Sequence, residues 1–117
     1  MARGKDTQAR PRNVMMWANR NGLFSVRYRA TGEFLLGKPF VEVNWMNGFD
    51  EKGRPIRVPG MTPSAEGTKI YPGNAGGTSW YSPSYSLHTG LFYVSAWADY
   101  FLPYVKEHQE SPKACGM

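Results

Sequence analysis

The sequence has little cysteine or histidine, the residue types that build disulfides and many metal sites. Its 117 residues include one cysteine, Cys115, and two histidines, His88 and His108, which lie in different segments without the spacing of metal ligands. These counts exclude an internal disulfide and a cysteine-based metal site. We therefore predict no metal-binding residues in this chain.

Long apolar runs are also missing. No stretch approaches the ~20 apolar residues that a membrane-spanning helix needs. The first residues, MARGKDTQARPRN, are basic but are not followed by an apolar segment. They do not form a signal peptide. We expect no membrane span and no export signal within this chain.

Acidic residues are scarce at the start of the chain. Residues 1–29 hold seven of the 14 lysines and arginines but only one of the nine acidic residues. The net charge of +5 is thus a property of one end. A basic arm can bind phosphate backbones, but no RNP, zinc-knuckle or recognition-helix pattern accompanies it. We predict no nucleic-acid partner.

Glycine and proline, by contrast, are frequent. The 13 glycines and nine prolines are spread so evenly that long helices are not expected. An aromatic content of 15% argues against disorder. The chain is long enough for one domain at most. Together these features predict an all-β fold of short strands, with a basic arm over residues 1–12, a folded part over 13–105 and a tail over 106–117.

The first half of the chain carries the clearest strand signals. Asn21-Gly22 separates two apolar runs and is a strong hairpin signal, because both residues tolerate a positive φ. Thr31-Gly32 turns the chain again. We predict an antiparallel meander of three strands, over Val14–Asn19, Leu23–Tyr28 and Glu33–Leu36.

Expectations for the following segments are more varied. The alternating sequence FVEVNW predicts a fourth strand over Phe40–Trp45. Residues Met46–Asn74 are rich in Gly, Pro and charge, and we predict a long loop that is functional or crosses another part of a larger protein. Ala98–Gln109 is expected to be irregular or a short helix.

Residues 75–97 form the most distinctive segment. Gly76-Gly77 allows close approach of the backbone because neither residue has a Cβ, and Trp80 follows. Ser84–Ser86 and Leu91–Val94 predict two short strands joined by a tight turn. One interpretation is a sheet edge that presents backbone and one ring to a planar ligand. The alternative is an ordinary β core with Trp80 buried in it.

A strand, a Thr-Gly turn and a second strand occur twice, around Thr31-Gly32 and Thr89-Gly90. Such repetition is typical of repetitive β architectures such as propellers. Units of this kind cannot bury their faces alone and need neighbours.

Three stretches resemble one family over roughly residues 12–105: VMMWANRNGLFSV, RATGEFLLGKPFVEVNW and IYPGNAGGTSWYSPSYSLHTGLFYVSAW. They are similar to the quinoprotein alcohol dehydrogenases, the methanol and ethanol dehydrogenase family that uses pyrroloquinoline quinone (PQQ). The resemblance implies an eight-bladed β-propeller in the parent enzymes. This chain then corresponds to about one and a half to two blades from the second half of the propeller, with antiparallel meanders and a long Gly/Pro-rich loop.

The resemblance also implies roles for three residues. Arg20, in WANRNG, matches the cation that binds the quinone carbonyl oxygens beside the catalytic aspartate. A fixed cation there stabilises the negative charge that develops on the carbonyl. Ser79 and Trp80 match an Asn-Trp pair that lines the cofactor pocket. Ser79 departs from the family's asparagine and shortens the polar side chain.

The family's calcium ligands and catalytic aspartate fall outside the matching region and have no counterpart here. The resemblance thus implies that Ca²⁺ belongs to the parent enzymes, and that the isolated chain does not oxidise alcohols. It further implies a periplasmic location, a small alcohol as substrate and a c-type cytochrome as electron acceptor. The alternative is a non-catalytic relic or interaction module, whose exposed blade edges pair with a second copy or an intact propeller.

Overall fold

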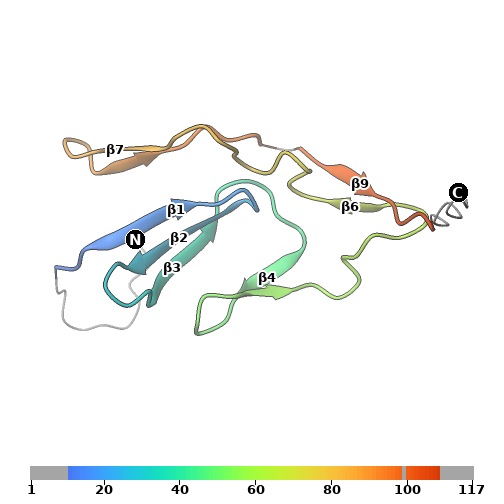
Figure 1. Ribbon diagram of the computed structural model, residues 1–117, viewed down its shortest axis with the longest axis horizontal. Coiled ribbons are helices and arrows are strands. Elements are labelled where there is room, and N and C mark those ends of the chain that lie inside the picture. The colour runs from blue at the N-terminus through green and yellow to red at the C-terminus, as the bar shows by residue number, and fades with distance from the viewer. Residues whose placement is uncertain (1–10, 99, 109–117) are drawn as a thin grey trace, which may run out of the picture.

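The computed structural model describes residues 11–98 and 100–108 and confirms an all-β architecture (Figure 1). The described part contains nine strands and no helix. The strands are β1 (Val14–Ala18), β2 (Leu23–Tyr28), β3 (Phe34–Pro39), β4 (Met46–Phe49), β5 (Pro55–Arg57), β6 (Thr68–Ile70), β7 (Ser84–Ser86), β8 (Leu91–Tyr93) and β9 (Leu102–Tyr104).

The first three strands form an antiparallel sheet in the order β1-β2-β3, which confirms the predicted meander. The β1–β2 turn is closed by hydrogen bonds from Asn19 N to Leu23 O (2.9 Å) and from Gly22 N to Asn19 O (3.0 Å). Gly22 has a φ of +88°, a conformation that side chains with a Cβ rarely adopt. The Asn-Gly sequence therefore sets the position of this turn.

The prediction of a strand over Phe40–Trp45 was wrong, because the next strand, β4, begins only at Met46. The alternating valines of this segment do not line a sheet face. Instead Val41 and Val43 pack against Gly22, where an added Cβ would lie 2.9 Å from the Cγ2 of each valine. Asn44 accepts a hydrogen bond from Tyr71 N (2.9 Å), which ties the segment to a distant part of the chain.

The long loop predicted over Met46–Asn74 is also wrong, since the segment contains three strands. β4 and β5 form a hairpin, and β6 pairs antiparallel with β9 in the register Thr68↔Tyr104. The latter pairing corrects the expectation of irregular or helical structure after Ala98. Its two strands are far apart in the sequence, so no local pattern announces their partnership.

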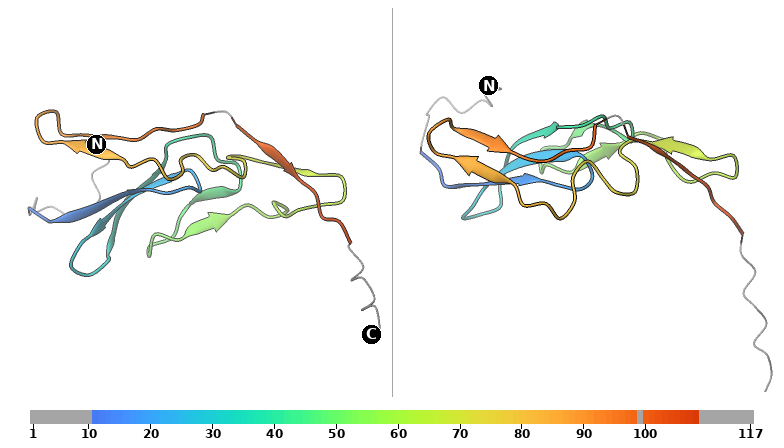
Figure 2. Two further views of the ribbon diagram at one scale, coloured as in Figure 1. Left: turned by 45° about the horizontal axis from the view of Figure 1, so that its top comes forward. Right: turned by 90° about the horizontal axis from the view of Figure 1, so that it is seen from above.

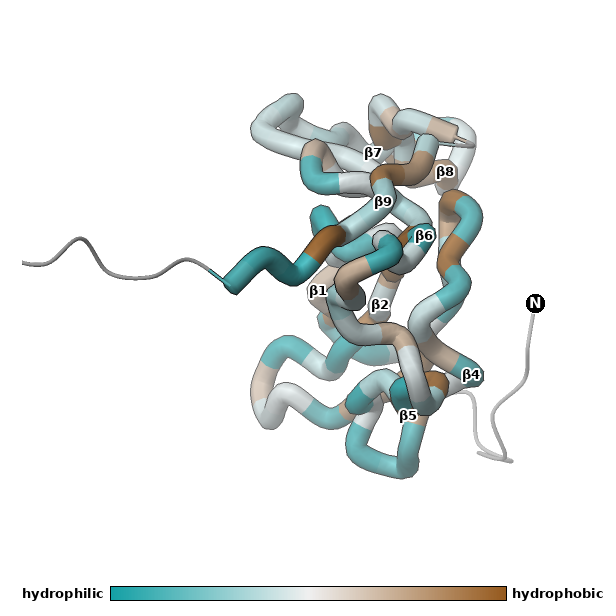
Figure 3. Tube along the Cα trace, turned by 90° about the vertical axis from the view of Figure 1, so that its right-hand side faces the viewer, coloured by the Kyte–Doolittle hydropathy of each residue, from teal (hydrophilic) through white to brown (hydrophobic). Residues whose placement is uncertain are grey.

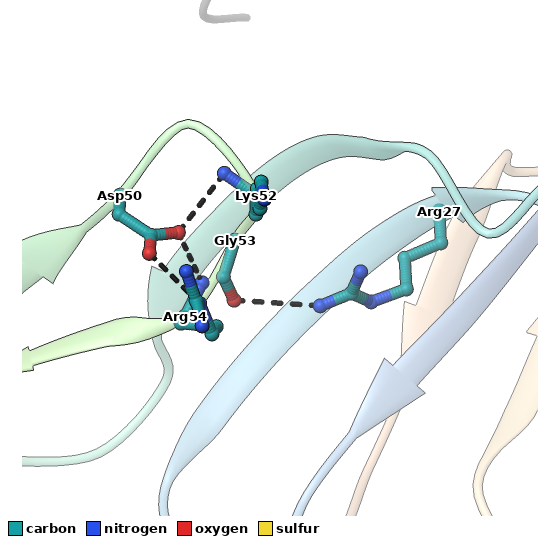
Figure 4. Close-up of polar contacts among 5 residues, drawn as sticks. All are labelled: Arg27, Asp50, Lys52, Gly53 and Arg54. Carbon is teal, nitrogen blue, oxygen red and sulfur yellow. Dashed lines mark hydrogen bonds and ion pairs between the residues drawn. The ribbon is translucent and has the colours of Figure 1, made fainter.

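Asp50 fixes the turn of the β4–β5 hairpin (Figure 4). Its Oδ1 accepts hydrogen bonds from the backbone N of Arg54 (2.8 Å) and of Lys52 (2.9 Å), and its Oδ2 accepts one from Arg54 Nε (3.0 Å). The backbone bond from Arg54 is the main reason why the pKa of Asp50 lies below its ordinary value. Arg27 on β2 donates to Gly53 O (3.3 Å) and so attaches this turn to the sheet.

We expect acid to open this turn. Because the folded-state pKa of Asp50 is lowered, its stabilising effect is present above the unfolded-state pKa and is lost as the pH falls through the folded-state pKa. The protection factors of the Lys52 and Arg54 amides, measured by NMR and corrected for the pH dependence of intrinsic exchange, should therefore fall at acid pH more than that of Gly32, which lies in another turn. Asp50→Asn should show fast exchange already at neutral pH. Exchange that stays slow in this variant would contradict the role of the carboxylate.

The strands lie in layers that are joined by few contacts. The β7–β8 hairpin lies on one face of the β1–β2–β3 sheet and the β4–β5 hairpin lies on the other, as Figures 1 and 3 show from two sides. The ring centroids of Phe24 and Phe92 are 5.3 Å apart in the first interface, and those of Phe34 and Phe49 are 5.3 Å apart in the second. Aromatic pairs thus fix the spacing of the layers.

The described part has almost no buried core. Leu23 is its one buried hydrophobic residue, at 4% exposure, whereas 13 large hydrophobic residues are exposed. Figure 3 shows apolar segments spread from the β7–β8 layer to the β4–β5 layer, and Figure 2 shows that the strands do not close around a centre. Strand faces left uncovered in this way are expected of repeat units that are described without their neighbours.

Candidate functional site

Arg20 lies in the tight turn between β1 and β2, where its side chain reaches beyond the end of the sheet. Its backbone N donates to Asn19 Oδ1 (2.7 Å), which helps to hold the turn. Its Nη2 donates to the backbone O of Asn74 (2.6 Å), 54 residues further along the chain. The guanidinium is thereby fixed at the junction of two distant segments, while the residue remains exposed.

The glycine pair contacts this same turn. Gly77 N donates to Arg20 O (2.9 Å), and a Cβ on Gly77 would lie 3.0 Å from Gly22 Cα. Gly76 has a φ of +80°, and a Cβ there would collide with the Cγ and the backbone O of Arg20. The sequence correctly predicted a close approach at these glycines. The group approached, however, is the β1–β2 turn of the same chain, whereas one interpretation of the sequence had placed a planar ligand beside this segment.

The backbone just before Ser79 contacts the β1–β2 turn, and it also contacts the segment that follows β8. Thr78 is buried, at 5% exposure, and its Oγ1 donates to Ser95 O (2.7 Å). The carbonyl of Gly77 accepts a hydrogen bond from Trp97 N (2.9 Å). The backbone that leads into Ser79 is therefore clamped between the β1–β2 turn and the segment after β8.

A second set of contacts holds Asn74. The hydroxyl of Tyr100 donates to Asn74 Oδ1 (2.6 Å), and Gly73 N donates to Tyr100 O (3.0 Å). Gly73 lies so close to this ring that a Cβ would be 2.6 Å from its carbon atoms. The carbonyl of Asn74 is thus in a fixed position to accept the bond from Arg20.

Around Arg20 lies a hollow of about 360 Å³. Its lining combines amide side chains, glycine backbone and two aromatic residues with a single charged side chain, that of Arg20. The lining residues are Asn19, Arg20, Asn21, Trp45, Pro72, Gly73, Asn74, Gly76 and Tyr104. A hollow with one cation, several amides and no acidic group favours an anionic or carbonyl-bearing ligand.

Of the residues that line this hollow, the sequence singled out Arg20 as a site residue; among those it missed are Trp45, Asn74 and Tyr104. Trp45 ends the segment that was wrongly predicted as a strand, Asn74 ends the segment that was predicted as a loop, and Tyr104 lies on the unforeseen strand β9. The motif PGNAGG offered a signal for Asn74, since an amide beside three glycines is a usual arrangement where the backbone must present polar groups.

The structure places Trp80 in solvent. The residue is 89% exposed, so the alternative of a ring buried in a β core is wrong. Ser79 is half-buried beside it. Neither residue lines the hollow around Arg20. The structure thus joins the turn of Arg20 to the backbone before Ser79, and it leaves the face of the Trp80 ring free.

A larger hollow, of about 620 Å³, lies on the other side of Trp45. It is lined mainly by the end of β5 and the segment between β5 and β6, including Arg57 and Met61, and it does not contain Arg20. We base the candidate site on the smaller hollow, because its cation and amides are fixed by hydrogen bonds between distant segments.

The described residues hold no group of three or more His, Cys, Asp or Glu side chains arranged to bind a metal ion. Within that same part of the chain, no helix has the length and apolar character needed to cross a membrane.

Comparison with known proteins gives a consistent set of relatives. The chain is 41% identical over 87 residues to a 1-butanol dehydrogenase (cytochrome c) of Thauera butanivorans, and 37% identical over 87 residues to the quinohemoprotein alcohol dehydrogenase of Comamonas testosteroni. These matches cover 74% of the chain but only 13% and 12% of the relatives, so the chain spans about an eighth of their length. No family model matches.

Solved structures agree with the sequence matches. The crystal structure of the Comamonas testosteroni enzyme superimposes with a TM-score of 0.69 at 37% identity, covering 74% of this chain and 13% of that one. A europium-containing methanol dehydrogenase superimposes with a TM-score of 0.67 at 32% identity, covering 74% of this chain and 16% of that one.

Proposed function

The chain belongs to the quinoprotein alcohol dehydrogenase family, and on that premise we propose that its Arg20 hollow forms one wall of a PQQ pocket. The observation that carries the proposal is the fixed guanidinium of Arg20, bonded to Asn74 O at 2.6 Å in a hollow that three asparagines help to line. Ser79 and Trp80 extend this wall from the clamped glycine segment.

The described residues fit one edge of such a cofactor. PQQ is flat and carries carboxylates and carbonyl oxygens, and the hollow offers one cation and several amide groups to oxygen atoms. The Trp80 ring, 89% exposed, is free to stack against a flat group that approaches from outside the described part. When bound, PQQ supplies the electron acceptor for alcohol oxidation.

Arg20 contributes a permanent positive charge to this wall. Its bond to Asn74 O uses Nη2 and leaves further guanidinium N–H groups available to the hollow. A cation held in advance stabilises negative charge on a neighbouring oxygen without reorganising during the reaction. Ser79 contributes a hydroxyl, which is shorter than the family's amide and donates one proton.

The remaining parts of an active site lie elsewhere. The described residues offer no cluster for Ca²⁺, and no carboxylate lines the hollow. We propose that the metal and the general base belong to other blades of the parent propeller. Primary alcohols as substrates, a c-type cytochrome as electron acceptor and a periplasmic location follow from the family and are part of this proposal.

The isolated chain should therefore show no alcohol-dependent reduction of an artificial dye when PQQ and Ca²⁺ are supplied. A fixed cation alone provides neither proton abstraction nor a metal-bound cofactor. The assay compares the chain with the Comamonas testosteroni enzyme under identical conditions. Turnover by the chain would contradict the proposal that it supplies only one wall.

A further inference from the structure

Tyr100 contacts the turn over residues 73–76 with both its backbone and its side chain. Its carbonyl accepts a hydrogen bond from Gly73 N (3.0 Å), and its hydroxyl donates to Asn74 Oδ1 (2.6 Å). The turn itself is closed by a hydrogen bond from Gly76 N to Gly73 O (2.8 Å). Two consecutive residues of the turn are therefore held by one tyrosine.

The bond that closes this turn leaves the carbonyl of Asn74 to another partner. In a β-turn the closing bond joins the first carbonyl to the fourth N–H, so the carbonyl of the second residue takes no part in it. Asn74 is the second residue here, and its carbonyl accepts the hydrogen bond from Arg20 Nη2 at 2.6 Å. The position of this acceptor thus depends on the contacts that hold Asn74 from outside the turn.

The ring of Tyr100 is packed, so its hydroxyl has a defined position. Trp97 meets the ring edge-on, with centroids 6.4 Å apart and an angle of 79° between the planes. The ring also lies against Gly73, where an added Cβ would be 2.6 Å from its carbon atoms. The backbone N of Trp97 donates to Gly77 O (2.9 Å), which attaches this segment to the glycine pair. A packed side chain with two torsion angles delivers its hydroxyl to one place.

We propose that Tyr100 is a positioning residue for Arg20, which acts through Asn74. The hydroxyl of Tyr100 holds the side chain of Asn74, and the carbonyl of Asn74 holds the guanidinium in the hollow. Tyr100 itself is not among the residues that line this hollow. The positioning does not require the proposed function, whereas its consequence for turnover rests on that function.

NMR of the full chain tests the positioning in the absence of a cofactor. A guanidinium held by a hydrogen bond rotates slowly about its Cζ–Nε bond, so its two Nη groups give separate signals. Tyr100→Phe keeps the ring and the backbone carbonyl but removes the hydroxyl. Exchange between the Nη signals of Arg20 should then accelerate by up to about fivefold, the net contribution of one hydrogen bond.

Two further variants make this measurement specific. Asn74→Ala removes Oδ1 but keeps the backbone carbonyl, so it should accelerate the exchange at Arg20 as Tyr100→Phe does. The double variant should show no larger change, because both substitutions break the same bond. Tyr93→Phe is the matched control, since it also loses one hydroxyl contact, to Thr89 Oγ1 (3.3 Å), but in the β7–β8 hairpin. It should leave the Arg20 signals unchanged.

Turnover tests the consequence, in a graft that places the residues of this chain, including Arg20 and Tyr100, in the matching segment of the Comamonas testosteroni enzyme. Tyr100→Phe should lower turnover about fivefold when Arg20 is present and should have no effect in an Arg20→Gln graft. A positioning residue has no effect once the group that it positions is gone. A residue that only stabilised the fold would lower turnover equally in both backgrounds.

Unchanged Arg20 signals in Tyr100→Phe and Asn74→Ala, or an equal change in Tyr93→Phe, would overturn the positioning. An equal loss of turnover in both grafts would overturn it as well, because Tyr100 would then act independently of Arg20. If Arg20→Gln alone keeps full turnover, the proposed function fails, and the NMR measurement then decides whether Tyr100 positions the guanidinium.

Discussion

Gly76→Ala is expected to lower the free energy of unfolding by about 2 kcal/mol more than Gly60→Ala does. Both glycines have nearly the same backbone conformation, with φ of +80° and +81°. A methyl group on Gly60 meets nothing within 4 Å, so that variant carries only the penalty of a left-handed conformation. A methyl group on Gly76 also collides with Arg20, including its backbone O.

The difference between these two variants isolates the contact between the glycine pair and the β1–β2 turn. Backbone oxygen cannot rotate away as a flexible side chain can, so the collision must displace one segment from the other. Urea unfolding followed by tryptophan fluorescence, at one protein concentration for all samples, measures the effect. Equal losses in the two variants would show that this contact does not hold the site together.

Local chemistry explains which parts of the fold were predictable. The Asn21-Gly22 turn and the strands beside it were predicted correctly, because turn residues and apolar runs lie next to each other in the sequence. The β6–β9 pair was missed, because the register Thr68↔Tyr104 joins strands more than 30 residues apart. Phe40–Trp45 was misassigned because alternating valines can serve a packed connection as well as a strand.

The candidate site was predictable in a similar, partial way. The glycine pair correctly indicated a close approach, but its partner, the turn of Arg20, is set by tertiary structure. Arg20 was selected from family resemblance, and Trp80 both from its place after the glycine pair and from the resemblance. Their roles remain predictions. The high exposure of Trp80 had no signal in the local sequence, since an isolated tryptophan among turn residues is compatible with a core or a surface position.

Arg20→Gln is expected to lower turnover about 100-fold in a grafted dehydrogenase, an active enzyme into which the residues of this chain have been placed. A loss of this size is usual when one fixed electrostatic group is removed from an active site. The graft replaces the matching segment of the Comamonas testosteroni enzyme with the residues of this chain. The bond to Asn74 O at 2.6 Å is made by the Nη2 atom of Arg20. Glutamine keeps a neutral N–H donor on a shorter side chain, so the variant removes the positive charge without introducing an apolar group.

Arg20→Lys is the matched control. Lysine keeps the positive charge but loses the planar fork of donors. If charge is the contribution of Arg20, Lys should retain most of the turnover and Gln should not. Lysine also retains N–H donors. If the planar fork of the guanidinium is the contribution of Arg20, the Lys and Gln forms should both lose turnover.

Alcohol-dependent dye reduction in the grafted enzyme tests whether Arg20 belongs to the quinone pocket, when it is measured for Arg20, Arg20→Lys and Arg20→Gln with equal amounts of bound PQQ. We predict that the Arg20 and Lys forms turn over and that the Gln form falls about 100-fold below the Arg20 form. A folded, PQQ-loaded Gln form as active as the Arg20 form would contradict the claim that Arg20 belongs to the quinone pocket.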